Sequence, residues 1–185
     1  MFFVEIIKFF VSDNCILTIC VREESGKRLI KGLVGRDVPV VCDPTLLFTG
    51  EEWLSIQKQE IIIKEPYILC YFLGNNPPHR KFAERLKNAT GCKIVALTHL
   101  DEYVKSDEGY ADYMPYDIDP ADFLNLIRNA EYVCTDSFHC SVFSMLYKKI
   151  FFTFKRYTRK TRSSTKALAS SVNWSMVSVF LSTPK

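Results

Sequence analysis

The sequence predicts an α/β fold in which helices cover a Rossmann-like parallel sheet. Two observations lead to this prediction. Strand-like runs alternate with amphipathic segments from Tyr67 to Phe154, and such alternation is typical of parallel sheets with right-handed crossovers. The first of these runs, YILCYFL at residues 67–73, is apolar throughout, as expected for a strand that is covered on both faces.

Three elements are predicted before this run. CILTICV at residues 15–21 and VPVVC at residues 38–42 are short apolar runs that favour buried strands. A helix is predicted between them, reaching about Leu33, and Gly35 is positioned to end it. Asp43 precedes Pro44 and Thr45, and we expect its side chain to hold this turn rather than to perform chemistry.

The segments at the chain start and before residue 67 have a different character. The opening run MFFVEIIKFFV lacks a basic leader and a small-residue cleavage site, so it does not fit a signal peptide. It is too short to span a bilayer and is predicted to be a helix packed in a core. Thr49 is expected to cap a short helix that contains Trp53, and residues 57–65 are expected to be a linker.

The elements after residue 74 follow one another regularly. Residues 99–118 are acidic and rich in tyrosine without clear periodicity, and we expect them to be irregular. Gly91 is a stop signal for the preceding helix, and Asp119 with Pro120 opens the following one. The predicted helices cover residues 79–89 and 120–130, and the predicted strands cover residues 93–98, 131–135 and 150–154.

The last two strands enclose a turn that is typical of binding sites. Thr135, Asp136 and Ser137 are helix-capping residue types, and an apolar periodic run follows them. In an open α/β sheet such a turn lies at the carboxyl edge of a strand, where the first N–H groups of the helix point at a ligand. His139 is the only histidine in this turn.

Charge and cysteine content restrict the function further. All 21 acidic residues lie before residue 137, whereas residues 155–185 carry seven Lys or Arg. A phosphorylated or carboxylated ligand would be attracted to that end, although charge alone favours a solvated basic tail. The seven cysteines are odd in number and include no C-x-x-C pair. We therefore expect buried free thiols in a reducing cytoplasm, with neither a disulfide framework nor a zinc site.

Five segments are more specific in combination than any one of them alone. They are VREESGKRLIKGL, DVPVVCDPTLL, EPYILCYFLGNNPPHRKFAERL, DIDPADFLNLIRNAEYVCTDSFHCSVFSMLY and FFTFKR. Together, over about residues 17–156, they resemble the polysaccharide pyruvyl transferase family. The resemblance implies a GT-B-like architecture and a truncated chain, because typical members are about twice as long. It implies a remnant of the N-terminal domain at residues 1–64, a C-terminal Rossmann-like domain at 65–156 and an atypical basic tail at 157–185.

The resemblance also implies a reaction. Members of the family transfer pyruvate from phosphoenolpyruvate onto two hydroxyls of a sugar of a cell-surface polysaccharide, which gives a ketal. The implied ligands are phosphoenolpyruvate and a saccharide acceptor, with no cofactor and no nucleic acid. Truncation would leave an interdomain face uncovered, and Phe2, Phe3, Phe9 and Phe10 are expected to favour self-association. Peripheral association with a membrane is left open.

His139 is the first candidate catalytic residue. Formation of a ketal from an enol ether requires a proton on the methylene carbon, which leaves a cation at C2 for a sugar hydroxyl to attack. That step needs a general acid with a pKa near neutrality. The resemblance maps His139, in an S-F-H turn, onto the family's candidate acid. The residues alone would favour a capping or packed histidine.

Arg22 and Ser25 are candidate substrate-binding residues. Arg22 directly follows a predicted strand, as in the S-V-R-E motif of the family, and its guanidinium could clamp a phosphate or carboxylate. The alternative is an ion pair with Glu23 or Asp43. Ser25 is a hydroxyl donor or a helix cap. We expect Arg22 and His139 to bind one anion across a cleft.

Further candidates follow the strands of the second unit. Some relatives carry Arg at the position of Ser137, and Lys155 and Arg156 are expected to supply that charge here. Gly74 and Asn75 follow the first strand, where phosphate-binding loops are found.

Two other functions stay open at this stage. A GT-B glycosyltransferase would bind a nucleotide sugar at the same sheet edge, although no acidic residue is clearly placed for a ribose. A non-catalytic remnant would bind an anion or a partner domain, and the missing half makes this a serious alternative.

Overall fold

The computed structural model describes residues 19–60, 62–99 and 103–155. The chain divides into two compact units, Met1–Leu47 and Phe48–Lys185, which are considered one at a time. The predicted N-terminal helix, the four phenylalanines at positions 2, 3, 9 and 10, Arg156 and the basic tail lie outside the described residues. In the part of the chain that is described, no helix is both long and apolar enough to cross a membrane.

The second unit contains a four-stranded parallel sheet, as the sequence predicts. Its strands are β1 (Tyr67–Tyr71), β2 (Lys93–Leu97), β3 (Tyr132–Thr135) and β4 (Ile150–Thr153). They lie in the order β2-β1-β3-β4, and every pairing is parallel. The chain therefore starts at an inner strand, moves outward to β2, crosses back over β1 to β3, and ends at the other edge.

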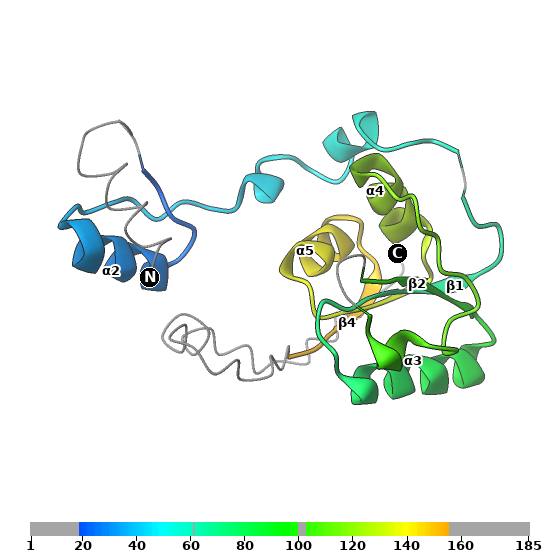
Figure 1. Ribbon diagram of the computed structural model, residues 1–185. Helices are drawn as coiled ribbons and strands as arrows, with labels where there is room; N and C mark the ends of the chain where they lie inside the picture. Colours follow the sequence, from blue (N-terminus) through cyan, green and yellow to red (C-terminus); the bar gives the residue numbers. More distant parts are fainter. Residues whose placement is uncertain (1–18, 61, 100–102, 156–185) are drawn as a thin grey trace. The chain divides into compact units, whose positions relative to one another are not determined.

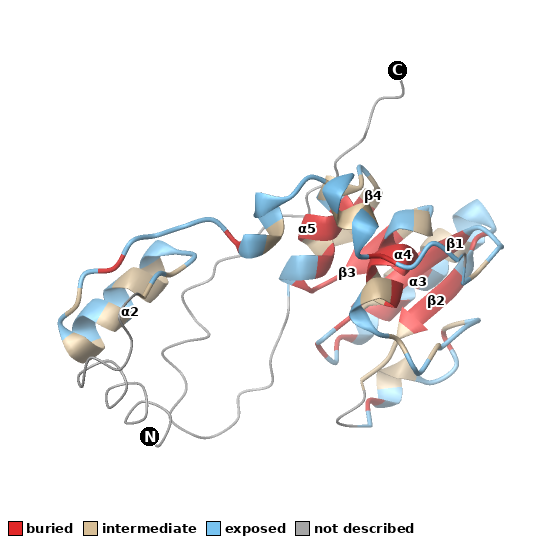
Figure 2. Ribbon diagram, turned by 90° about the horizontal axis from the view of Figure 1, so that it is seen from above, coloured by how far each residue is buried: buried red, intermediate tan, exposed pale blue. Residues whose placement is uncertain are grey.

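Helices cover both faces of the sheet (Figure 1). Helices α4 (Pro120–Asn129) and α5 (Phe138–Leu146) pack on one face, and α3 (Pro77–Thr90) packs on the other. Because successive side chains of a strand point to opposite faces, β1 contributes to two cores. Tyr67 and Leu69 pack with the α4 and α5 side, whereas Ile68 and Cys70 pack with the α3 side. Figure 2 shows the buried strands between helices with exposed outer faces.

Local signals in the sequence explain where these helices begin and end. Asp119 caps α4 in a reciprocal capping box with Asp122, in which each carboxylate accepts the other residue's backbone N–H. Gly91 follows α3 with a φ of 74°, a left-handed conformation that glycine adopts without steric cost. The helix α3 begins two residues earlier than predicted, because proline is compatible with the first turn of a helix.

The described part of the acidic, tyrosine-rich stretch, residue 99 and residues 103–118, is irregular, as predicted, apart from the short 3₁₀ helix η3 (Lys105–Asp107). Its later part lines the outer edge of β2, where Asp112 and Tyr113 exchange backbone hydrogen bonds with Ile94 and Ala96. The carboxylate of Asp112 also accepts from the Ile94 N–H and from Lys87. This stretch therefore covers a sheet edge that would otherwise present unpaired backbone groups.

The segment that precedes the sheet is attached to the α4 and α5 side. Trp53 lies in the 3₁₀ helix η2 (Glu52–Ser55) and packs edge-on against Phe143, with ring centroids 5.2 Å apart. Lys58 binds the carboxylates of Asp119 and Asp122 at 2.9 and 2.6 Å. The hydrogen bonds from Lys58 to Asp122 and to Asp119 raise the pKa of its ammonium. The predicted linker, residues 57–65, is thus bound through Lys58 to the first turn of α4.

The first unit is built around α2 (Glu24–Val34) and one turn. The helix ends at Gly35, which has a φ of 71°. The strands predicted at residues 15–21 and 38–42 are wrong for the described residues, because only a single parallel bridge joins Val21 to Val40. A short pair without further strands gains too little packing to extend into a sheet.

Asp43 holds the turn of the first unit, as predicted. Its buried carboxylate accepts from the Thr45 N–H and hydroxyl at 3.0 and 2.7 Å, and it forms an ion pair with Arg22. Burial by itself would raise the pKa of this carboxyl, but the hydrogen bonds from Thr45 and Arg22 outweigh it and lower the pKa to about 2.

The cysteines are only partly as expected. All six described cysteines are free thiols. Cys70, Cys92, Cys134 and Cys140 are buried, and burial raises the pKa of Cys140 to about 12, so this thiol is unreactive. Cys20 and Cys42 are exposed, contrary to the prediction, because the runs that contain them are not sheet strands.

A substitution at Gly50 tests whether the segment that precedes the sheet packs closely against the end of α5. A Cβ added to Gly50 would lie 2.6 Å from the Leu146 carbonyl oxygen. We expect Gly50→Ala to lower the free energy of unfolding by about 1–3 kcal/mol, as overpacking does. Gly32→Ala is the matched control: Gly32 lies within α2, a Cβ there meets no atom within 4 Å, and we expect a gain of about 0.4–1 kcal/mol. Differential scanning calorimetry measures both, and equal effects would contradict the close contact.

The lowered pKa of Asp43 leads us to expect that stability depends on pH. Because its pKa is lower in the folded chain than the ordinary value near 3.8, ionisation stabilises the fold above about pH 4, and this contribution is lost as the pH falls towards 2. We expect the carboxyl signal of Asp43 to titrate near pH 2 by NMR. Asp43→Asn should reduce the hydrogen-exchange protection of the Thr45 amide at neutral pH. A carboxyl titration near pH 4 would contradict the geometry.

Candidate active site at the carboxyl edge of the sheet

The sheet has a topological switch point between β1 and β3. The connection that follows β1 leads through α3 to β2, and the connection that follows β3 leads through α5 to β4 on the opposite side. In open α/β sheets, ligands bind in the crevice outside the carboxyl ends of the two strands at such a point. The loops that follow β1 and β3 are therefore positioned to form a binding site.

Asp136 joins these two loops. It follows β3 directly, is buried, and its two carboxylate oxygens accept the backbone N–H groups of Leu73 and Gly74 at 2.6 and 3.0 Å. The sequence suggested that Asp136 caps the next helix. The structure assigns that role to Ser137, whose hydroxyl accepts the Cys140 N–H at 3.5 Å.

A second connection reinforces the first. The hydroxyl of Thr135 donates to the Tyr71 carbonyl oxygen at 2.6 Å and accepts from the Ser137 N–H at 3.0 Å. The turn between β3 and α5 is thus held to β1 through a side chain as well as through the sheet. The segment that carries His139 therefore starts from a rigid base.

His139 is the second residue of α5 and is exposed. Its ring meets the neighbouring Phe138 ring edge-on, with centroids 5.3 Å apart. The first turn of a helix suits a bound anion, because the helix dipole is positive there. The imidazole thus stands at the carboxyl end of β3, beside the switch point, where a ligand can reach it.

The loop after β1 contains Gly74 and Asn75, and its polar groups are largely engaged. The Gly74 N–H binds Asp136, and its carbonyl oxygen accepts from Arg80 Nη1 at 2.6 Å. The side-chain oxygen of Asn75 accepts from the Ser106 hydroxyl at 2.7 Å. This loop is therefore a supporting element, in contrast to phosphate-binding loops whose N–H groups point at the ligand.

The remaining candidates are distributed over both units. Lys155 follows β4, is exposed, and lies at the same sheet edge as His139. Arg22 belongs to the first unit and contacts Asp43, which is one of the two ion pairs considered from the sequence. Ser25 is the second residue of α2, and Glu23 occupies the N-cap position, so Ser25 is not the helix cap.

Three residues at this edge escaped the sequence analysis. Arg80 is buried in α3 and donates through Nε and Nη2 to Asp107, at 2.9 and 2.5 Å. The other oxygen of Asp107 faces His99 Nδ1 at 3.0 Å. Arg80 lies three residues before Ala83, on the buried face of α3. A charged residue on this otherwise apolar face of the predicted helix was the feature of the sequence that could have marked Arg80. Asp107 and His99 lie in a stretch without periodicity, so no pattern marked them.

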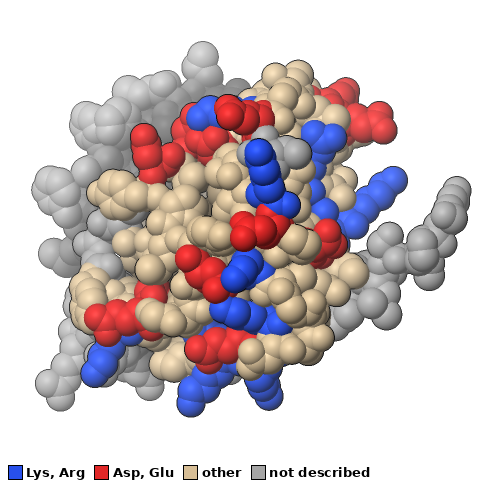
Figure 3. Space-filling view, turned by 90° about the vertical axis from the view of Figure 1, so that its right-hand side faces the viewer, with Lys and Arg blue, Asp and Glu red and all other residues tan. Residues whose placement is uncertain are grey.

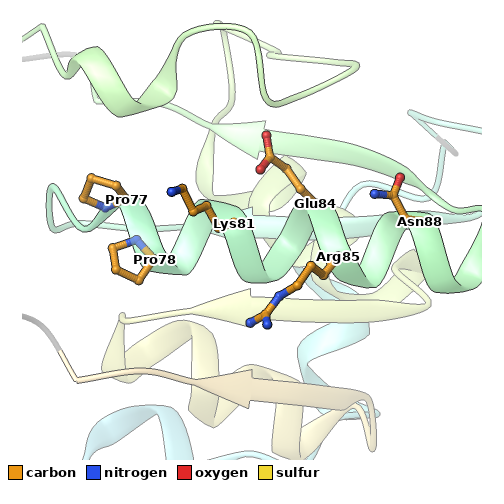
Figure 4. Close-up of a pocket in the computed structure, with 6 residues that line it drawn as sticks. All are labelled: Pro77, Pro78, Lys81, Glu84, Arg85 and Asn88. Carbon is orange, nitrogen blue, oxygen red and sulfur yellow. The ribbon is translucent and has the colours of Figure 1, made fainter.

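The rest of the described surface has no feature that brings the predicted site residues together. Figure 4 shows an open hollow along α3 lined by Pro77, Pro78, Lys81, Glu84, Arg85 and Asn88. None of the predicted site residues lines it. On the face in Figure 3, Lys and Arg are interspersed with Asp and Glu, so this face has no continuous basic stripe. Among the described residues, no three His, Cys, Asp or Glu side chains are grouped so that they could hold a metal ion.

Comparison with known proteins gives one result that bears on the family. The chain has no match among curated proteins or among solved structures. The family model described as polysaccharide pyruvyl transferase matches residues 12–156 of the 185 residues. This range includes the described part of the second unit and its carboxyl edge. The chain belongs to the polysaccharide pyruvyl transferase family.

Proposed function

We propose that this chain takes part in the transfer of pyruvate from phosphoenolpyruvate to two hydroxyls of a saccharide, forming a ketal in a cell-surface polysaccharide. The observation that carries the proposal is the family match over residues 12–156, which includes an exposed histidine in the first turn of the helix at the switch point. The family suggests a saccharide acceptor. The GT-B-like arrangement, the domain boundaries and the cytoplasmic location expected from the sequence belong to the same proposal.

His139 is proposed as the general acid. It would donate a proton to the methylene carbon of phosphoenolpyruvate, and the first sugar hydroxyl would then bond to C2 and lose its own proton. Phosphate would leave as the second hydroxyl closes the ketal. The exposure of the imidazole supports this role, because the ring can approach a bound dianion without the penalty of burial. The dianion would favour the protonated ring, and the positive end of α5 would oppose it.

Arg22, Ser25, Ser137, Lys155 and Arg156 are proposed to bind the anionic donor. In the first unit, Arg22 contacts Asp43 while its side chain remains 53% exposed. A guanidinium that is already oriented by a carboxylate loses less side-chain freedom when it binds an anion. Gly74 and Asn75 are proposed to shape the loop that faces the donor.

The first test is binding. We expect calorimetric titration to detect phosphoenolpyruvate, and Arg22→Ala to weaken its affinity about ten- to a hundredfold, as expected for the loss of a charge-assisted contact. Arg28→Ala is the matched control, because Arg28 is an exposed arginine of α2 in the same unit as Arg22 and is not one of the predicted site residues. A thermal shift with UDP- or GDP-sugars but none with phosphoenolpyruvate would favour a glycosyltransferase instead.

The second test separates chemistry from binding. We expect His139→Gln to reduce phosphate release from phosphoenolpyruvate by about 10²–10⁴-fold in the presence of a saccharide acceptor. The affinity for phosphoenolpyruvate should change much less, because a general acid acts mainly in the transition state. If affinity and rate fall by the same factor, His139 is a binding residue. If wild type binds the donor and neither value changes in the variant, the acid lies elsewhere.

A further inference from the structure

Several buried nitrogen atoms at the carboxyl edge have no hydrogen-bond partner. Five buried side-chain N or O atoms of the described residues lack one, and three of these are nitrogens that follow β1 or β2 in the chain: Asn76 Nδ2, His79 Nδ1 and His99 Nε2. A buried polar group without a partner is costly, so each case calls for an explanation. All three belong to segments that follow strands at the carboxyl edge of the sheet, which suggests a common explanation.

The local structure does not explain why the amide nitrogen of Asn76 is buried without a partner. It occupies the N-cap position of α3, yet its side chain makes no capping hydrogen bond. The next two residues are Pro77 and Pro78, which have no N–H to offer. The first available N–H, that of His79, donates to the Asn76 backbone oxygen at 3.0 Å. The amide nitrogen is therefore not needed to begin the helix.

The geometry of His99 leaves one specific atom unused. Asp107 accepts two hydrogen bonds from Arg80 on one oxygen and faces His99 Nδ1 with the other. An ionised carboxylate only accepts, so Nδ1 carries the proton. The side chain of His99 is 13% exposed. The ring is thus fixed in orientation, and Nε2 cannot turn towards another partner. A carboxylate that orients a histidine in this way is common where the second nitrogen acts on a ligand.

Arg80 connects the two positions. Its Nη1 lies 3.4 Å from the Asn76 backbone oxygen, and its Nε and Nη2 bind the Asp107 carboxylate that orients His99. The charges of Arg80 and Asp107 offset each other. The nearby N–H groups of Leu73 and Gly74 are engaged by Asp136. Of the three unpartnered nitrogens, the amide of Asn76 always donates and the imidazole of His99 donates when it is protonated. Burial lowers the pKa of His79 and so disfavours the charged form of that ring.

We propose that Asn76 and His99 form an oxyanion subsite that takes a carboxylate. Nitrogen donors without partners match a ligand that only accepts hydrogen bonds. A carboxylate, with two oxygens and one charge, fits two donors and a single chargeable imidazole better than a phosphate dianion does. The identification of this ligand as the carboxylate of the pyruvyl donor rests on the proposed function. Since both nitrogens are closed to solvent, binding requires a loop to open, which lowers the association rate.

The experiment combines NMR of the imidazole nitrogens with calorimetry. The chain has three histidines, so their ring signals are few, and the signals of His79 and His139 show whether an anion also acts at those rings. Pyruvate, inorganic phosphate and phosphoenolpyruvate are titrated separately. We expect the His99 Nε2 signal to move saturably with pyruvate and phosphoenolpyruvate, and to move less with phosphate at equal concentration.

The variants separate a binding role from a structural one. His99→Asn keeps a donor for Asp107 and removes Nε2, whereas His99→Gln places an amide nitrogen near the Nε2 position. We expect His99→Asn and Asn76→Ala each to weaken pyruvate binding at least tenfold, and His99→Gln to weaken it less. Asn88→Ala, on the exposed side of α3, is the matched control. Asn76→Ala should melt no lower than wild type, because the amide nitrogen has no partner to lose.

Each outcome bears on a different statement. If phosphoenolpyruvate binds and moves the His139 signal while His99 and both substitutions have no effect, this subsite is wrong and the proposed function stands. If pyruvate binds here but no transfer occurs, the subsite stands and the proposed function falls. Phosphate binding without pyruvate binding would overturn the carboxylate assignment. A lower melting temperature of Asn76→Ala with unchanged affinity would make Asn76 structural, and wild type that binds none of the three anions would refute both proposals.

Discussion

The carboxyl edge of the sheet depends on the bridge that Asp136 makes between two strands. A parallel sheet fixes its strands through backbone hydrogen bonds, but these end where the strands end. Beyond that point the loop after β1 would be free to move relative to the turn after β3. The buried carboxylate of Asp136 prevents this by accepting the N–H groups of Leu73 and Gly74. Hydrogen bonds to an ionised acceptor are about twice as strong as neutral ones, so one side chain holds both loops.

This bridge also determines which groups remain available for chemistry. The N–H groups that a glycine-containing loop usually offers to a phosphate are engaged internally here. Arg80 engages the carbonyl oxygen of the same loop and carries the connection onward to Asp107 and His99. The loops are therefore held by the Asp136 carboxylate through backbone N–H groups and by Arg80, which pairs with Asp107. An incoming anion would meet side chains, such as His139 and Lys155, rather than a cradle of backbone N–H groups.

The first unit follows the same physical rule on a smaller scale. Asp43 is buried and would be unfavourable as a charge, yet Thr45 and Arg22 keep it ionised. The interaction restrains Arg22 and still leaves about half of its side chain in solvent. In both units, an aspartate directly after an apolar run fixes a turn. Arg22 is paired with Asp43, and His139 lies three residues after Asp136. Such support is what a binding residue needs to keep its geometry.

The sequence by itself determined the α/β class, the parallel sheet and nearly every helix of the second unit. Those features follow from local chemistry: apolar runs of strand length, the capping residues Asp119 and Ser137, and glycines such as Gly91 that adopt left-handed backbone angles. The sequence also predicted the turn that carries His139, the candidate acid that the family resemblance implies. Only the tertiary structure decided that Asp136 is a bridge and not a cap, that Val21 and Val40 form a bridge and not two strands, and that Arg80, Asp107 and His99 are connected. Each of these joins residues far apart in the chain, and the energy of such contacts depends on burial and distance, which no local pattern encodes.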